Sequence, residues 1–305
     1  MKRLQEHILS DNLVQRVLSW WETRRWAGCS FHGKEGIEAA IRILCEKGLK
    51  SRHPAIRDAL LILEEESDIL TAGIGKPGKY LDDLGLGGSK MIRAVVFAYT
   101  GVEKHPFVKT QINSALEGFK FVIAVPYIEK IINKRAGKLV FKPGVVWPSL
   151  YHLRLLAFTK GWRTPDNHNI VVEAIKKLVS MSPLPQIYAL VNSQLVAPAS
   201  FGMLDFNPSM RLMSSASWMR WFQRLELLAR LGVVRYVSEL ESQLQQLNQM
   251  LDNHGGWFKK KINHSSFRDW GVYNGLQLEE DWRSPKRRMY DLTFRSLLID
   301  YYANQ

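Results

Sequence analysis

Two adjacent carboxylates, Asp82 and Asp83, are the first residues of this chain whose types and spacing suit chemistry. Such a pair can supply a general acid, or it can hold Mg²⁺, which takes oxygen ligands and bridges phosphates. The segment Gly85–Gly88 that follows can present backbone N–H groups to a phosphate at the start of the next helix. An Asp pair that caps a turn before a flexible link explains the same residues. We predict both aspartates as catalytic and expect no cofactor, with Mg²⁺ as the alternative.

A second set of reactive groups falls in one segment near the C-terminus. Asp269 and Trp270 are followed, within the same predicted loop, by Asp281, Trp282 and Arg283. Carboxylates, indoles and a guanidinium together can bind a planar cation, a sugar or a base through stacking and charge-assisted hydrogen bonds. We predict the two aspartates as catalytic and the other three residues as ligand-binding. The alternative is that this loop is a plug that packs the interior of the protein.

Two histidines and one further aspartate complete the predicted site. His32 lies three residues after Cys29, His152 lies within an apolar segment, and Asp205 lies in a loop with aromatic residues. We predict all three as ligand-binding, while a structural loop for His32 and a core histidine for His152 remain open. The eight histidines lack the spacing of zinc ligands, and two cysteines cannot build a disulfide framework. We therefore expect no metal site.

The charge of the chain points to anionic partners. It has 42 lysine and arginine residues against 29 aspartate and glutamate residues, which gives a net charge of +13. The alternative function is accordingly nucleic-acid binding, through basic clusters with aromatic residues nearby. The residues predicted for it are Lys134, Arg135, Lys138, Lys259, Lys260, Lys261, Arg287 and Arg288. A solvated basic face explains the same residues.

A repeated pattern of helices must position these groups. Five apolar segments are predicted as helices, and after most of them a Gly and then a Pro predict the end of one helix and the start of a second, amphipathic one. The apolar segments are 38–48, 91–101, 153–161, 221–232 and 290–302. Strand signals are few, with the best at 137–146. We predict a single all-α domain over 1–305, formed by five to six helical hairpins in a ring, or alternatively an open solenoid.

This pattern resembles the α/α-toroid repeats of the terpenoid cyclase and protein prenyltransferase superfamily. The stretch from Gln249 to Trp257 matches the Gln-x5-Gly-x-Trp core of the motif that ties outer helices together in triterpene cyclases. The Asp-x-Asp-Asp acid of the class II cyclases and the Asp-x-Cys zinc pair of the prenyltransferases are both missing. The resemblance implies the scaffold and a central cavity for an apolar or phosphorylated small molecule. Whether the protein is an enzyme stays open.

The start of the chain is polar and carries no apolar stretch typical of a secretory signal. No apolar run approaches the length needed to span a bilayer. We expect a soluble cytoplasmic protein.

Overall fold

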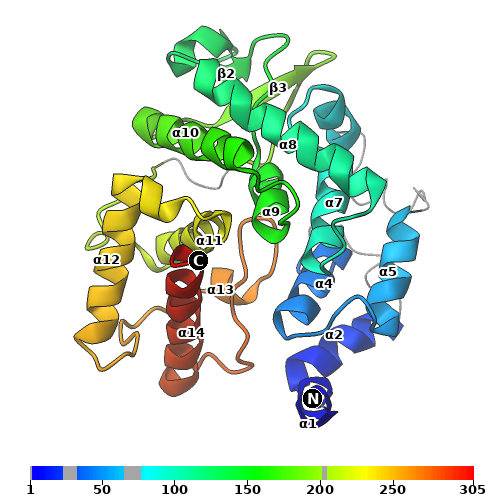
Figure 1. Ribbon diagram of the computed structural model, residues 1–305, viewed down its shortest axis with the longest axis vertical. Helices are drawn as coiled ribbons and strands as arrows, with labels where there is room; N and C mark the ends of the chain where they lie inside the picture. The colour runs from blue at the N-terminus through cyan, green and yellow to red at the C-terminus, as the bar shows by residue number, and fades with distance from the viewer. Residues whose placement is uncertain (1, 23–32, 65–76, 201–204) are drawn as a thin grey trace.

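The computed structural model describes residues 2–22, 33–64, 77–200 and 205–305, and this part of the chain is mostly helical (Figure 1). The α-helices are α1 (Lys2–Leu9), α2 (Asn12–Glu22), α4 (Ile37–Glu46), α5 (Pro54–Glu64), α7 (Ser89–Tyr99), α8 (Pro106–Ala124), α9 (Leu150–Phe158), α10 (Pro165–Met181), α11 (Ser215–Leu231), α12 (Ser238–Asp252), α13 (Ser265–Arg268) and α14 (Pro285–Ala303). Short 3-10 helices span Ile128–Ile131 and Val234–Tyr236. All five predicted apolar helices are present, as α4, α7, α9, α11 and α14.

Glycine and proline mark the helix ends largely as the sequence predicts. Gly48, Gly101 and Gly232 adopt positive φ angles just after α4, α7 and α11, a conformation that costs glycine little. Helices α8 and α10 carry Pro in their first turn, and the side chains of His105 and Thr164 accept hydrogen bonds there from backbone N–H groups. These local signals set the helix boundaries before any tertiary contact is considered.

The five apolar helices lie side by side in chain order. Helix α4 packs against α7, α7 against α9, α9 against α11, and α11 against α14. An ion pair between Arg295 on α14 and Glu46 on α4 connects the last of these helices to the first. The amphipathic helices lie outside them: α5 contacts α7, α8 contacts α7 and α9, and α12 contacts α14 (Figure 1).

A small mixed sheet corrects the all-α prediction. Strands β1 (Ile132–Arg135), β2 (Lys138–Phe141), β3 (Ile187–Val191) and β4 (Gln194–Val196) are arranged in the order β1-β2-β3-β4. The outer pairs are antiparallel hairpins and the central β2–β3 pair is parallel. Strands of three to five residues are too short to show a clear alternating pattern in the sequence. Only the first hairpin lies near the predicted strand signal.

Each apolar helix also buries charged side chains. Each of the five helices has at least one buried charged residue, and these include Arg42, Arg93, Arg154, Glu226 and Arg295. Burial of unpaired charge is costly, so these groups must find partners inside the protein. Within the described ranges, no helix combines the length and the apolar character needed to cross a membrane.

Candidate functional site

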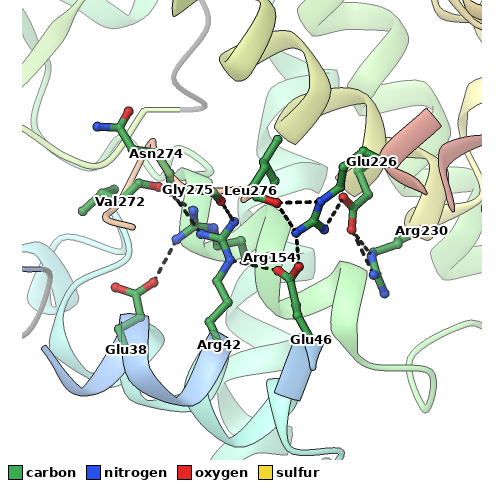
Figure 2. Close-up of polar contacts among 11 residues, drawn as sticks. Glu38, Arg42, Glu46, Arg154, Glu226, Arg230, Val272, Asn274, Gly275 and Leu276 are labelled. Carbon is green, nitrogen blue, oxygen red and sulfur yellow. Dashed lines mark hydrogen bonds and ion pairs between the residues drawn. The ribbon is translucent and has the colours of Figure 1, made fainter. Parts of the chain in front are cut away.

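We call the five apolar helices α4, α7, α9, α11 and α14 the inner helices. The backbone of loop 272–276 lies among them, where arginine side chains bind it (Figure 2). Arg154 on α9 donates to the carbonyl of Val272 at 2.5 Å, and Arg42 on α4 donates to the carbonyl of Gly275 at 2.8 Å. Arg295 on α14 donates to the carbonyl of Leu276 at 2.8 Å. Three helices from distant parts of the chain thus bind one short stretch of main chain.

Glutamates from two of the inner helices neutralise these arginines. Arg154 Nη1 lies 2.8 Å from Glu38 Oε1, and both side chains are almost completely buried. Arg295 pairs with Glu46 and, at 3.1 Å, with Glu226. Burial opposes the charge of Arg295, but these two carboxylates outweigh it and raise the pKa of the guanidinium. Burial likewise opposes the charge of Glu226, yet Arg295 and Arg230 lower its pKa.

The geometry of the loop makes Gly275 a sensitive position. Its φ is +88°, and a Cβ there would lie 2.6 Å from the Cα of Trp270. We predict that Gly275→Ala lowers the free energy of unfolding by at least about 2 kcal/mol, through backbone strain and overpacking. Gly256→Ala is the matched control, because Gly256 has a φ of +83° with open space around it. Urea denaturation of both variants should show the larger loss at Gly275, and equal losses would contradict this account of the loop.

A pocket of about 710 Å³ lies at the edge of this filled interior. We call it the rim pocket. It is bounded by α2, the 33–36 turn, α13 with the residues after it, and the 277–280 segment. Its cations are Arg16, Lys34 and Arg268, and its carboxylates are Glu35, Asp269, Glu279 and Glu280. Trp20 and Trp270 add aromatic surface. Loops more than 200 residues apart in sequence therefore form one concave, strongly charged site.

Several charged groups of the rim pocket have no ion-pair partner among the described residues, so they can pair with a ligand. In the part of the chain that the structure describes, Arg16, Arg268 and Asp269 take part in no ion pair. Gln277 is only 7% exposed, and its Nε2 donates to the carbonyl of Glu280 at 3.1 Å. Its Oε1 is buried and has no hydrogen-bond partner. A buried acceptor of this kind is costly unless a donor reaches it.

The structure separates the residues predicted in the C-terminal loop. Asp269 and Trp270 line the rim pocket, although Trp270 is 4% exposed and stacks against Arg42. Trp282 belongs to the core, where its indole N–H donates to Asp291 at 2.6 Å. Asp281 and Arg283 are exposed and pair with each other across 3.7 Å. Only the first part of the predicted set lies in the rim pocket.

Of the other predicted aspartates, Asp82 and Asp83 end a helical segment over 77–83, and Asp205 lies in a loop. The Asp82 carboxylate accepts hydrogen bonds from the N–H groups of Gly88 and Lys90, both at 3.0 Å, and so caps the start of α7. Burial raises the pKa of Asp82, against the opposing effect of these hydrogen bonds. Asp83 is exposed. The exposed Asp205 carboxylate accepts from the N–H of Asn207 at 2.8 Å. The capping alternative thus fits the contacts of Asp82, whereas Asp83 makes no capping contact among the described residues.

His152 is fully buried near the start of α9. Its Nδ1 accepts from the N–H of Ser149 at 2.9 Å in a capping box, while its Nε2 has no partner. Burial lowers its pKa to about 3.

His32 and Cys29 lie outside the described residues. No group of three or more histidine, cysteine or acidic side chains with the arrangement of a metal site occurs among the residues described.

The basic residues fall on two separate surfaces. Lys134, Arg135 and Lys138 are exposed on the β1–β2 hairpin, beside a groove of about 560 Å³ that the first two line. Lys259, Lys260 and Lys261 are exposed in the segment after α12, and Lys260 lies over the ring of Trp218. Arg288 donates to the carbonyls of Trp282 and Arg283, so it has a structural role, whereas Arg287 is exposed.

Sequence reasoning missed the buried ion pairs and Gln277. One signal was present: Glu38, Arg42 and Glu46 recur at four-residue intervals on a helix that is otherwise apolar, which predicts one charged stripe on a buried face.

Comparison of this chain with protein-family models, with curated proteins and with solved structures gives no match, so its function is inferred from its own residues.

Proposed function

We propose that this chain is a single α/α-toroid domain that binds a small zwitterionic molecule, such as an amino acid, in the rim pocket. The toroid is supported by the contacts that run in order from α4 to α14 and by the Arg295–Glu46 ion pair between the two ends. Because loop 272–276 occupies the centre, the ligand site lies at the rim.

The observation that carries this proposal is that Arg16, Arg268 and Asp269, charges of both signs that form no ion pair with a described residue, line one pocket. A ligand ammonium can donate to the Asp269 carboxylate and pair with it, while a ligand carboxylate pairs with Arg16 or Arg268. An apolar ligand would desolvate these charges without compensation. The pocket therefore favours a charged ligand over the apolar molecule that the toroid resemblance implies as one alternative.

Calorimetric titration with the standard amino acids tests the proposal. We expect at least one to bind, and its N,N,N-trimethyl analogue, which lacks the N–H donors for the Asp269 carboxylate, to bind at least about tenfold more weakly. If no amino acid binds, or if the trimethyl analogue binds equally well, the proposal is wrong.

Two pairs of variants locate the binding site. Asp269→Asn and Arg268→Met, inside the pocket, should each weaken binding about tenfold or more, through loss of one charged contact. Asp281→Asn and Arg283→Met make the same chemical changes at exposed positions outside it and should leave affinity unchanged. Equal effects of the two pairs would place the ligand elsewhere.

The groove beside the sheet supports a second candidate function, nucleic-acid binding. Lys134 and Arg135 line it and form no ion pair with any described residue, and Lys138 lies on the same hairpin. If they contact phosphates, alanine at all three positions should reduce the slope of log affinity against log salt for single-stranded DNA by about 2. A second variant with alanine at Lys259, Lys260 and Lys261 shows whether the other basic surface contributes to the same slope. Absence of binding at low salt, or an unchanged slope in the hairpin variant, would exclude this function for the hairpin.

A further inference from the structure

A stripe of large apolar side chains runs along the solvent face of α14. Tyr290, Phe294, Leu297 and Tyr301 are 36%, 45%, 53% and 59% exposed. Their spacing of four, three and four residues places all four within about 60° on one side of a helix, at 100° per residue. Residues between them on the same helix, such as Leu292 and Ile299, are buried in the core. The stripe is therefore a second apolar face of α14, directed away from the core.

Exposed apolar stripes of this spacing are typical of helix–helix interfaces. Trp257 extends the stripe sideways, because it is 41% exposed and its ring lies 5.6 Å from that of Tyr290. The neighbouring helix α12 contacts α14 but leaves these side chains exposed. The described residues around them leave 36–59% of each stripe side chain exposed.

We propose that a second copy of this chain covers the stripe, through antiparallel pairing of α14 with its counterpart about a two-fold axis. The spacing is the same read in either direction, with its midpoint between Phe294 and Leu297. A two-fold axis at that point sets Phe294 opposite the partner's Leu297 and Tyr290 opposite the partner's Tyr301. Every stripe residue then meets another stripe residue, as a self-complementary interface requires.

The charges along α14 favour the same arrangement. Lys286 and Arg287 are exposed in the first turn, one turn before Tyr290. Antiparallel pairing brings these cations to the last turn of the partner helix, where the carbonyl end of the helix dipole is negative. Parallel pairing would instead place the cations of the two chains side by side. The arrangement therefore matches both apolar surface and charge.

The net charge of +13 on each chain opposes association at low ionic strength. Because salt screens this repulsion over a Debye length of about 8 Å at physiological ionic strength, the dimer should strengthen as salt is added. Nucleic-acid binding by the same surface, with Trp257 and Tyr290 stacking on bases, would weaken with salt. Salt dependence thus separates the two uses of the surface.

Sedimentation equilibrium of the full chain at several salt concentrations tests the proposal. We expect a reversible dimer with micromolar affinity that tightens with salt, and weakening of about 100-fold or more in Phe294→Glu, because each new carboxylate faces the partner's Leu297. Leu61→Glu changes an exposed leucine on α5 and should leave the dimer intact. Circular dichroism and the melting temperature at a single low protein concentration show whether each variant is folded.

A wild-type protein that stays monomeric at high salt and high concentration would overturn the proposal. A dimer that Phe294→Glu leaves intact while the variant is folded would overturn it too, because the interface would then lie elsewhere. Binding of single-stranded DNA that is lost in Phe294→Glu, without any self-association of the wild type, would assign the stripe to nucleic acid instead.

Discussion

Replacement of Arg295 by methionine is expected to lower the free energy of unfolding by about 3–5 kcal/mol, the range for removing one partner of a buried ion pair. Arg295 is 1% exposed, and it pairs with Glu46 and Glu226 and donates to the carbonyl of Leu276. Methionine fills much of the same volume but leaves the buried Glu226 and the partly buried Glu46 without this cation. Thermal unfolding should show a melting temperature lower by about 5–8 °C.

Two comparisons make this prediction specific to the ion pairs. Arg283→Met is the matched control, since the Arg283 side chain is 95% exposed and its substitution should cost less than about 0.5 kcal/mol. Adding Glu46→Gln and Glu226→Gln to Arg295→Met should recover only part of the loss, because it removes the two carboxylates that lost Arg295 but also the ion-pair partners of Arg42 and Arg230. A loss at Arg295 no greater than that at Arg283 would mean that the network does not hold the inner helices together.

Acid is expected to destabilise the protein through His152. Its pKa in the folded state is lowered from 6.5 to about 3 by burial. Below pH 6.5 His152 is protonated in the unfolded chain, whereas in the folded protein it stays neutral until the pH nears 3. The free energy of unfolding therefore decreases as the pH falls through this window. The slope reaches about 1.4 kcal/mol per pH unit, and the contribution of His152 between pH 7 and pH 5 is about 2 kcal/mol.

Urea unfolding of the wild type and of His152→Gln at these two pH values measures this contribution. The variant keeps a polar side chain that can accept the hydrogen bond from Ser149 but does not titrate, so its loss of stability on acidification should be about 2 kcal/mol smaller. His254→Gln is the control at an exposed histidine and should follow the wild type. Identical pH dependence of His152→Gln and the wild type would show that His152 is protonated equally in the folded and unfolded chains.

The helices could be predicted from the sequence because their signals are local. Gly48, Gly101 and Gly232, and the prolines that follow, act on the backbone conformation of their immediate neighbours. The sheet was missed because the pairing of β2 with β3 joins residues Leu139 and Ile187, which are far apart in the chain. Long-range pairing of such short strands leaves no periodic trace in either segment.

The site was predicted only in part for the same reason. Asp269 was predicted as a site residue of the C-terminal loop, and it lines the rim pocket together with Glu35 from a distant turn. Trp282 was predicted as a ligand-binding residue. In the structure its indole N–H donates to Asp291, which lies nine residues later on α14, in the core. Arg154 and Glu38 are 116 residues apart, so their pairing became visible only in the folded chain.

The position of a bound amino acid in a crystal of the full-length protein tests the central claim most directly. The crystal would be grown with the amino acid that binds best by calorimetry. We predict density in the rim pocket, with the ligand ammonium within hydrogen-bonding distance of the Asp269 carboxylate and its carboxylate against Arg268 or Arg16. Loop 272–276 should keep its contacts with Arg42, Arg154 and Arg295. Density for the ligand between the inner helices, with that loop displaced, would contradict the account.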